Sequence, residues 1–589
     1  MQRSFGSARR VAFLSLFAAL SGCETAPRTV PPSGLSGALD QYLTRIEGYG
    51  FSGVVLVARG DSVLLSKGYG CADTTCSARL TPRTAFYGAS LSKQFTATLV
   101  MQLVEQGRLA LTDSLPRFFQ AVPPDKRGIT VQQLLTHTSG LTSYHDADGA
   151  SPATREEWVR SLLATPLDFT PGSRAAYSNS GFSLLAAIVE QVSGHPFEEV
   201  ARDRLFVPAG FRDTWFASQA PAPGAPVASG VGAGIKVDPR TFGAGWGEKG
   251  ASGLMTSVED LWRWELALRS GTVISPASFA KMIQSWVPVA PGVPLWYGYG
   301  WRVQSLPRVG RVAWVSGLEQ PFSGMYRRYL DAGLTLIFLS NGAVGGLTWR
   351  DALFFALREG AIGQLLTGDG YTMPPWFDST RLAPGTYDGT YRHPAGGLLD
   401  VTTVDGAIRL TPGSQDIVNL LLPPAPDTLV VPVDSLTARV REALAAPGAD
   451  TNTTLGLGPL TDEGHRAPSP SVQLGSLRGV DWLVTVPVMR SPGSLLATTY
   501  GMLRFEKGTR VLRWRWSDGD AAGRDLGAGL GPLPPFRPQG ADVFVSYSLS
   551  LQRAMTVRFS RDSSGVVTAM HIVDGTGGSV ILPRIPPSS

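Results

Sequence analysis

The chain of 589 residues is too long for a single hydrophobic core, so two or three domains are expected. Its composition, 43% hydrophobic and 17% charged, is that of a folded globular protein. The net charge is +5, but the basic residues are scattered and form no run interleaved with aromatic residues, which excludes a nucleic-acid-binding surface of the usual kind.

The first residues have the pattern of a secretory signal peptide. A region with three arginines precedes an apolar stretch, residues 11–20, and small residues follow up to Cys23. A basic region, a short apolar core and small residues before a break are typical of such a signal. The apolar stretch is too short for a permanent transmembrane helix. We therefore expect residues 1–22 to be a signal peptide.

Residues 20–23, Leu-Ser-Gly-Cys, resemble the lipobox of bacterial lipoproteins. The resemblance implies that Cys23 is lipid-modified and becomes the first residue of the mature chain. A proline-containing tether over 23–34 would then hold the protein on the periplasmic side of a bacterial membrane, where more than one acyl chain gives stable anchoring. The alternative is plain cleavage, with no role for Cys23.

Strands flank a helical block in the next part of the chain. We predict a helix over 35–49, strands over 51–58 and 62–69, mostly helices from Ser90 to about Leu205, strands over 299–303, 312–315, 323–329 and 334–339, and a closing helix over 348–359. Strands, a helical block and strands again predict one sheet with an inserted helical subdomain.

Only two cysteines, Cys71 and Cys76, remain beyond the tether, and they bracket a short loop. In an exported protein this spacing is typical of a disulfide that pins the tip of a hairpin. No metal site is expected, because no third or fourth ligand stands at suitable spacing and no His-Glu-x-x-His occurs.

Residues 90–93, Ser-Leu-Ser-Lys, stand where a strand-like run gives way to an amphipathic helix. Helical side chains three residues apart lie one above the other, so the Lys93 amine is expected beside the Ser90 hydroxyl. A buried lysine with a lowered pKa can take the proton of a serine and make it a nucleophile. The helix N-terminus adds positive potential where an oxyanion would form. The pair predicts a covalent serine hydrolase.

The same spacing occurs again at Ser278 and Lys281, in a chain with only seven lysines. This second copy is expected to lie in an ordinary helix that Ser275 caps, with Pro276 at its first position. For Ser90, too, the alternative is an N-cap serine beside a solvated lysine. The surrounding motifs therefore have to decide between the two interpretations.

Tyr177-Ser178-Asn179 is the only Tyr-x-Asn in the chain and lies within the helical block. A tyrosine near a lysine can serve as a general base or acid. The Asn179 amide can hold a substrate carbonyl or orient the lysine. The alternative is a loop tyrosine followed by a turn-forming asparagine.

These motifs together resemble the serine β-lactamase and penicillin-binding protein superfamily, in particular its class C β-lactamase-like branch of esterases, D-amino-acid peptidases and β-lactamases. The resemblance runs from about residue 37 to 360 and rests on segments in the expected order at 90–93, 129–131, 134–141, 177–179 and 250–257. It implies that Ser90 is acylated, that Lys93 and Tyr177 transfer protons, and that Asn179 positions substrate.

The third motif of this superfamily, Lys or His followed by a small residue and Gly, corresponds here to Val315-Ser316-Gly317. Valine has no charge and no donor, so its contribution to binding a substrate carboxylate is missing. The resemblance implies that Ser316 and Gly317 line the substrate site. It also implies that the backbone N–H groups of Ser90 and Leu318 form the oxyanion hole, each worth about 3 kcal/mol. The site then either hydrolyses esters or amides without the usual carboxylate, or acylates slowly or not at all.

His137 could be mistaken for the base of a Ser-His-Asp triad. In the superfamily this position belongs to a structural turn, and Ser-Lys-Tyr chemistry needs no histidine, so a structural role is expected. No Gly-x-Ser-x-Gly occurs in the chain, which argues against an α/β-hydrolase.

From about residue 384 the pattern changes to β. Leu512, Trp514 and Trp516 alternate with arginines, which predicts a half-buried strand. Hairpin turns are expected at 405–406 and 518–519, and long loops over 440–475 and 521–540. Residues 384–391 resemble the start of the lipocalin-like β-domain that many of these hydrolases carry. One barrel and two smaller ones remain open alternatives, and a packing or solubilising role is at least as well supported as a catalytic one.

The predicted fold class is α/β (α+β), with a β-lactamase/transpeptidase-like sheet, a helical subdomain and an all-β, lipocalin-like C-terminal part. The predicted segments are 1–22 (signal), 23–34 (tether), 35–365 (hydrolase domain), 366–383 (linker) and 384–589 (β-barrel-like domain or domains). We expect an exported serine hydrolase that cleaves a small-molecule or peptide substrate, either a short ester, a D-amino-acid peptide or a β-lactam, without a metal or cofactor. Val315 makes a β-lactam the less expected substrate. The alternative is a catalytically impaired member that binds cell-wall peptides or a protein partner.

Overall fold

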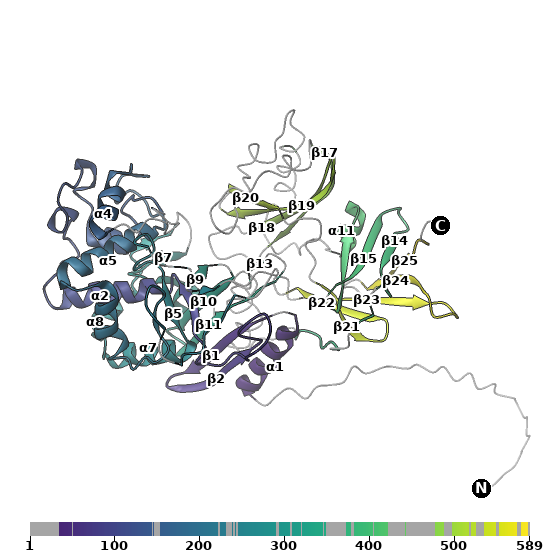
Figure 1. Ribbon diagram of the computed structural model, residues 1–589, viewed down its shortest axis with the longest axis horizontal. Coiled ribbons are helices and arrows are strands. Elements are labelled where there is room, and N and C mark those ends of the chain that lie inside the picture. The colour runs from purple at the N-terminus through teal and green to yellow at the C-terminus, as the bar shows by residue number, and fades with distance from the viewer. Residues whose placement is uncertain are drawn as a thin grey trace, which may run out of the picture.

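The computed structural model has a mixed α/β part at the N-terminal side and β-sheets at the C-terminal side (Figure 1). The structure describes residues 34–49, 51–143, 145, 154–221, 224–230, 238–239, 242, 245–289, 294–306, 309–319, 321–344, 347–348, 373–378, 382–383, 385–404, 406–421, 442, 477–487, 497–517, 520–525, 535–548, 553–573 and 579–586. The predicted signal peptide and Cys23 lie outside these ranges, as does the predicted loop 440–475 apart from residue 442.

The main sheet has eight strands in the order β2-β1-β11-β10-β9-β8-β7-β6, and every neighbouring pair is antiparallel. Its strands are β1 (Gly53–Arg59), β2 (Ser62–Tyr69), β6 (Val287–Pro288), β7 (Leu295–Tyr297), β8 (Arg302–Leu306), β9 (Gly310–Glu319), β10 (Phe322–Tyr329) and β11 (Leu334–Ser340). Because β1 pairs with β11, strands from both ends of this part share one sheet, as the sequence pattern predicted.

The predicted strand over 299–303 is wrong in position. The Gly298 N–H donates to Trp301 O in a turn, and β8 begins only at Arg302. Gly300 has φ +72°, and a side chain there would meet Lys93 O at 2.7 Å. At this turn the backbone passes so close to the helix that carries Lys93 that only glycine, which has no side chain, fits.

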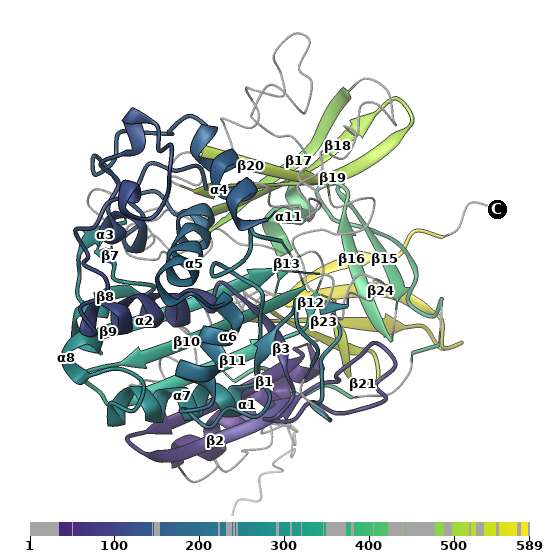
Figure 2. The ribbon, with the colours of Figure 1, turned by 60° about the vertical axis from the view of Figure 1, so that its left-hand side comes forward.

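Helices cover both faces of the sheet (Figure 2). They are α1 (Gly34–Gly48), α2 (Ser92–Glu105), α3 (Val131–Leu135), α4 (Arg155–Ala164), α5 (Asn179–Ser193), α6 (Phe197–Ala201), α7 (Val258–Ser270) and α8 (Pro276–Met282), with short 3-10 turns at Leu115–Arg117 and Pro124–Lys126 and a π turn at Arg202–Phe206. The larger core lies between the sheet and the helical block, where Phe95 and Trp264 pack with ring centres 4.6 Å apart. A second core lies between the other face and α1. Within the described ranges, no helix is long and apolar enough to cross a membrane.

A second, small sheet includes the strand that lies directly before α2 in the chain. It contains β3 (Phe86–Ala89), β5 (Leu254–Thr256) and β4 (Trp215–Phe216), in the order β3-β5-β4. The main sheet is followed by β12 (Ala343–Val344) and β13 (Leu347–Thr348). Thr348, the predicted first residue of the closing helix, therefore lies in a strand, and the rest of that predicted helix lies outside the described residues.

The C-terminal part contains one closed barrel and one separate sheet. The barrel strands are β14 (Gly389–Arg392), β15 (Leu398–Val404), β16 (Ala407–Pro412), β21 (Arg537–Gly540), β22 (Val543–Ser548), β23 (Arg553–Arg561), β24 (Val567–Val573) and β25 (Ser579–Pro583). Bridges between Ile408 and Phe536 and between Tyr391 and Arg584 join the two groups of strands at both edges. An apolar core fills the barrel, including Tyr391, Phe544 and Val557.

The second C-terminal sheet is inserted between the two groups of barrel strands. It follows α11 (Gln415–Leu421) and contains β17 (Leu477–Pro487), β18 (Ala497–Phe505), β19 (Gly508–Ser517) and β20 (Asp520–Asp525). The predicted strand at 512–516 is confirmed, and so are both hairpins, in which Val404 pairs with Ala407 and Ser517 with Asp520. The predicted loop 521–540 is wrong at both ends, because β20 and β21 pair with neighbouring strands there.

The barrel contacts the main sheet through α1 and Tyr49, the residue that follows α1. The Tyr49 and Tyr547 ring centres lie 6.0 Å apart, and Tyr49 Oη donates to Pro375 O at 3.0 Å. Arg45 Nη1 donates to Pro374 O at 2.7 Å. The described part of the connecting segment, 373–378, therefore lies against α1, on the opposite side of the sheet from the helical block.

Candidate active site

Ser90 lies in the tight turn between β3 and α2. Ala89 has φ +45°, a conformation that residues with a side chain adopt rarely. The turn is closed by the Leu91 N–H, which donates to Gly88 O at 3.0 Å, and by Ser92 Oγ, which donates to Ala89 O at 2.8 Å. This turn leaves Ser90 half-buried at the start of α2, where the helix N-terminus contributes positive potential.

Lys93 is buried, with 3% of its surface exposed, and its amine has three oxygen neighbours. Nζ lies 3.0 Å from Ser90 Oγ, 2.6 Å from Asn179 Oδ1 and 2.8 Å from Ala251 O. Burial lowers the pKa of Lys93 well below its usual range; Glu248 opposes this shift and Arg302 adds to it. The predicted adjacency of Ser90 and Lys93 is present, and Asn179 contacts the lysine.

Tyr177 completes the group around the serine, because its Oη donates to Ser90 Oγ at 2.8 Å. The next residue, Ser178, caps α5 by accepting from the Gly181 N–H at 3.0 Å. The Asn179 N–H, at the first helical position, donates to Ser143 O at 2.9 Å. The start of α5 thus holds Tyr177 and Asn179 on either side of the Ser90–Lys93 pair.

His137 contacts Tyr177 and Ser178. Its Nδ1 accepts from the Ser178 N–H at 3.1 Å, and its ring centre lies 4.6 Å from that of Tyr177. Burial lowers the pKa of His137 well below its usual range, with Lys93 and Arg302 adding to the effect. A neutral ring that accepts at Nδ1 carries its proton on Nε2. The contacts of His137 therefore support the Tyr177 turn, in line with the structural role predicted for it.

The third-motif segment of β9 runs beside Ser90. A side chain at Gly317 would meet Gly88 O at 1.9 Å and the Ser90 backbone nitrogen at 3.2 Å. Val315 is buried in the larger core with 5% exposure, while Ser316 and Leu318 are half-buried. Strand β8 pairs with β9 only as far as Trp314, so residues 315–319 have no β8 partner on that side.

Arg302 is a site residue that the sequence patterns missed. It stands opposite Trp314 in the β8–β9 register, and its Cζ lies 4.9 Å from the centre of the Trp314 ring. The same atom lies 5.3 Å from the Tyr177 ring centre and 5.8 Å from that of Tyr297. In the sequence, Arg302 is recognisable only as a strand residue after a glycine-rich turn. This pattern does not predict which residues it contacts in the fold.

The second Ser-x-x-Lys copy lies in α8, far along the chain from these residues. Ser275 caps this helix by accepting from the Ser278 N–H at 3.2 Å, and Pro276 occupies its first position, as predicted. Lys281 is exposed in the last turn of the helix. This copy has none of the contacts found at Lys93 among the described residues.

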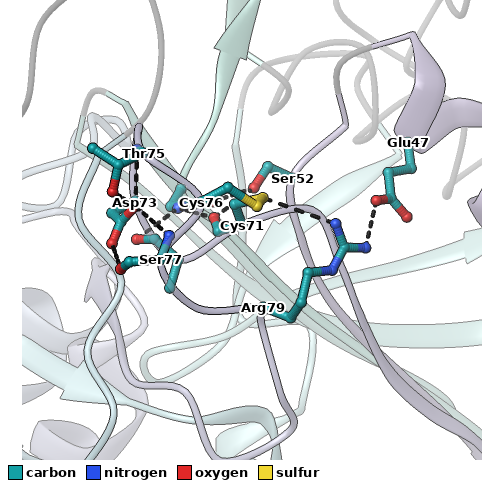
Figure 3. The surroundings of a disulfide bond; sticks show 10 residues. Glu47, Ser52, Cys71, Asp73, Thr75, Cys76, Ser77 and Arg79 are labelled. Atoms are coloured by element: carbon teal, nitrogen blue, oxygen red, sulfur yellow. Dashed lines mark hydrogen bonds and ion pairs between the residues drawn. A yellow bond between two sulfur atoms is a disulfide. The ribbon is translucent and has the colours of Figure 1, made fainter. Parts of the chain in front are cut away.

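Cys71 and Cys76 form a disulfide in the loop after β2 (Figure 3). Arg79 lies beside it, with Nη1 3.8 Å from Cys71 Sγ and Nη2 2.5 Å from Glu47 Oε1. Within the loop, Asp73 accepts from Thr75. Nowhere in the described residues do three His, Cys, Asp or Glu side chains form a group that could hold a metal ion.

The sequence and fold are similar to known proteins. A family model described as Beta-lactamase matches residues 39–357. Penicillin-binding protein 4* of Bacillus subtilis (strain 168) is 30% identical over 394 residues, which cover 63% of this chain and 85% of that protein. Esterase EstB of Burkholderia gladioli is 29% identical over 353 residues, covering 52% and 89%. The solved structure of the octameric penicillin-binding protein homologue from Pyrococcus abyssi shares the fold over 93% of this chain and 99% of its own, with a TM-score of 0.52 at 19% identity.

Proposed function

Because the chain belongs to the β-lactamase family of serine hydrolases, we propose that it cleaves an ester or amide through an acyl-enzyme on Ser90. The observation that carries this proposal is the environment of the Lys93 amine. Its three oxygen neighbours are the Ser90 hydroxyl, the Asn179 side-chain carbonyl and the Ala251 backbone carbonyl.

Two of these neighbours can only accept hydrogen bonds. A neutral amine has two protons and one lone pair. If both protons point at Asn179 Oδ1 and Ala251 O, the lone pair is directed at Ser90 Oγ, 3.0 Å away. The lowered pKa of Lys93, caused first by burial, favours this neutral form. Lys93 is therefore suited to accept the Ser90 proton.

In the acylation step, Ser90 Oγ forms a bond to the substrate carbonyl carbon while its proton moves to Lys93 Nζ. The negative charge on the carbonyl oxygen would be stabilised by the Ser90 and Leu318 N–H groups, and the close contact at Gly317 brings β9 to the required side of Ser90. The carbon–leaving-group bond then breaks. The leaving alcohol or amine takes a proton from Lys93 through the Tyr177 hydroxyl, which lies 2.8 Å from Ser90 Oγ.

In the second step, water attacks the acyl-enzyme carbonyl and gives up one proton to the Lys93–Tyr177 pair. That proton returns to Ser90 Oγ when the ester bond breaks, which restores the starting protonation state. We propose short esters, D-amino-acid peptides or amides, and β-lactams as the substrate classes, since the relatives include an esterase and a penicillin-binding protein. Export through residues 1–22, and a lipid anchor at Cys23 on the periplasmic side of the membrane, belong to the same proposal.

Intact-mass spectrometry with three substrates tests the proposal. The panel contains a p-nitrophenyl ester, a D-alanyl amide and a chromogenic cephalosporin, with Ser90→Ala as the control. We expect an acyl adduct and turnover with at least one member, both absent in Ser90→Ala. Turnover that survives Ser90→Ala would contradict the mechanism. No adduct with any of the three, even after long incubation, would favour the catalytically impaired alternative.

A further inference from the structure

The turn over residues 247–253 holds one of the backbone carbonyls that orient Lys93. Ala251 O lies 2.8 Å from Lys93 Nζ, a contact between residues 158 positions apart in the chain. If this carbonyl moved away, one amine proton would be free to point at Ser90, and the lone pair would lose its direction. The residues that fix Ala251 therefore also orient the proposed base.

Two helices hold the first half of this turn. Ser183 Oγ of α5 donates to Gly247 O at 2.9 Å. Thr96 Oγ1 of α2 donates to Gly250 O at 2.6 Å. These contacts fix the backbone before Ala251 but do not reach the residues after it.

Tyr87, from β3, holds the second half of the turn. Its side chain is buried, with 1% of its surface exposed. Its Oη donates to Glu248 Oε2 at 3.0 Å, accepts from the Gly253 N–H at 3.2 Å and lies 3.0 Å from Ser252 Oγ. One hydroxyl thus joins residues of the turn on both sides of Ala251.

Glu248 closes the turn with its backbone and gives it a negative charge with its side chain. Its carbonyl oxygen accepts from the Ala251 N–H at 3.0 Å and from the Ser252 N–H at 2.7 Å. The residue is half-buried, and within the described residues no Lys or Arg forms an ion pair with its carboxylate. The charge is therefore not neutralised by a direct partner.

The charged and titratable groups around Lys93 come from several parts of the fold. Burial lowers the pKa of Lys93, Glu248 opposes this shift, and Arg302 of β8 adds to it. The centre of the Tyr177 ring lies 4.8 Å from Lys93 Nζ. Burial holds the pKa of His137 well below its usual range, so this ring is neutral. Among these groups, only Glu248 favours the protonated form of the amine.

We propose that Tyr87 and Glu248 are positioning residues of the serine site. Tyr87 fixes the Ala251 carbonyl on Lys93, and the carboxylate of Glu248 raises the pH at which activity begins. This inference rests on the proposed function, because it explains how the base for Ser90 is oriented and when it is neutral. Both residues act through Lys93 and not on the substrate, and each predicts a different kinetic change.

Labelling of Ser90 by a fluorophosphonate tests the role of Tyr87 without a known substrate. The reaction is described by kinact, the maximal labelling rate, and KI, the reagent concentration at half that rate. Tyr87→Phe should lower kinact about tenfold and keep KI within about twofold, because a displaced carbonyl disturbs the lone pair and not the contacts of the reagent. A wild-type kinact in Tyr87→Phe would overturn its positioning role.

Tyr326→Phe is the matched control for Tyr87→Phe. Tyr326 is a buried tyrosine of β10, and its hydroxyl also donates to a carboxylate, that of Glu265 in α7. The control therefore removes the same kind of buried hydrogen bond without touching the turn, and it should leave kinact unchanged. An equal loss of kinact in the two variants would overturn the proposal, because it would show a general effect of lost stability.

The pH dependence of kinact/KI tests the charge of Glu248 separately from its hydrogen bond. Glu248→Gln keeps a side-chain oxygen that can accept the same hydrogen bond but removes the charge. The pKa of Lys93 should then fall, so the neutral amine persists to lower pH and the rising limb moves to lower pH. A limb that stays in place or moves to higher pH would overturn this role.

Glu198→Gln is the matched control for the charge. The Glu198 carboxylate lies 3.0 Å from the amine of Lys249, a residue of the same turn, and it has this cation as a direct partner. We expect the rising limb of Glu198→Gln to coincide with that of the wild-type protein. A shift equal to that of Glu248→Gln would show that any lost carboxylate near the turn has this effect, and would overturn the specific role of Glu248.

The proposed function and the positioning roles fail in different ways. If the wild-type protein forms no Ser90 adduct, the proposed function fails. If it forms the adduct, and if Tyr87→Phe and Glu248→Gln are labelled like the wild type at every pH, only the positioning roles fail. Melting curves show whether each variant is folded, and the Glu248→Gln result decides the proposal even if Tyr87→Phe does not fold.

Discussion

Two regions of this molecule have the same Ser-x-x-Lys spacing and little else in common. At the start of α2, Lys93 is buried and contacts Ser90, Asn179 and Ala251. In α8, Lys281 is exposed at the end of a short surface helix. Helical geometry brings serine and lysine to one face in both places, so the spacing alone does not create a catalytic pair.

The surroundings of the lysine separate the two regions. Burial at Lys93 penalises the charged amine, and two carbonyl oxygens accept hydrogen bonds from it, so that the lone pair of a neutral amine is left for the serine. Lys281 is exposed to solvent in the last turn of α8, and within the described residues it has none of the oxygen contacts that surround Lys93. We therefore expect the serine to be a nucleophile only where the neighbouring amine is buried and oriented. Matched substitutions in the two regions test this expectation.

The largest expected effect comes from replacing the two serines. Ser90→Ala removes the proposed nucleophile and should lower kcat for a p-nitrophenyl ester by about 10⁴-fold or more. Ser278→Ala should leave kcat and KM unchanged, because Ser278 lies in the first turn of a surface helix. Steady-state kinetics on both variants provide the measurement, and an equal loss in the two would contradict the assignment of Ser90.

The two lysines give the next largest difference. Lys93→Ala removes the proposed base and should lower kcat/KM by about 10³-fold, within the range for general-base catalysis. Lys281→Ala removes an exposed amine and should have no effect on kcat/KM or on the melting temperature. Pre-steady-state acylation rates are the most direct readout. If Lys93→Ala acylates at the wild-type rate, another group takes the serine proton.

Within the described residues, no tyrosine hydroxyl contacts Ser278 as that of Tyr177 contacts Ser90. Removing the Tyr177 hydroxyl therefore tests a second difference between the two regions. Tyr177→Phe keeps the ring that packs on His137 and removes only the hydroxyl 2.8 Å from Ser90 Oγ. We expect a loss of about 100-fold in kcat/KM, at the lower end of the general acid–base range. Tyr299→Phe, on a buried tyrosine outside the site, is the control. A full rate in Tyr177→Phe would exclude the hydroxyl from proton transfer.

The smallest effect concerns pH. Neutral Lys93 is the reactive form, so kcat/KM should rise with pH through the lowered pKa of this residue. Arg302 contributes to the lowering through its positive charge, after burial. Arg302→Gln should therefore raise the pKa of Lys93 and move the rising limb to higher pH. Arg311→Gln, at an exposed arginine near the start of β9 that is paired with Asp331, should not. A limb that stays in place or moves to lower pH would show that Arg302 does not act on Lys93.

The parts of the site that local geometry determines were predictable from the sequence. Ser90 and Lys93 are three residues apart at a helix start, and Tyr177 and Asn179 belong to one cap. The contacts from Lys93 to Asn179 and Ala251 span 86 and 158 residues. Such distant contacts have no periodic signal, and for the same reason Arg302 was missed.

The fold, like the site, has parts that the sequence predicted and parts that it did not. The sheet, the helical block and the hairpin pairs follow from hydrophobic periodicity and turn residues. Residues 521–540 are rich in Gly, Pro and Ala, which predicts a loop, yet β20 and β21 form at its two ends. Pairing with β19 and β22 outweighs the weak strand propensity of these residues.

Peptide mapping after covalent labelling tests the central claim most directly. The wild-type protein is treated with a fluorophosphonate, digested and sequenced by tandem mass spectrometry. We predict a single adduct on Ser90, which is absent in Ser90→Ala, slowed in Lys93→Ala and unchanged in Ser278→Ala. An adduct on Ser278, or labelling of Ser90 that proceeds at the wild-type rate without Lys93, would contradict the account.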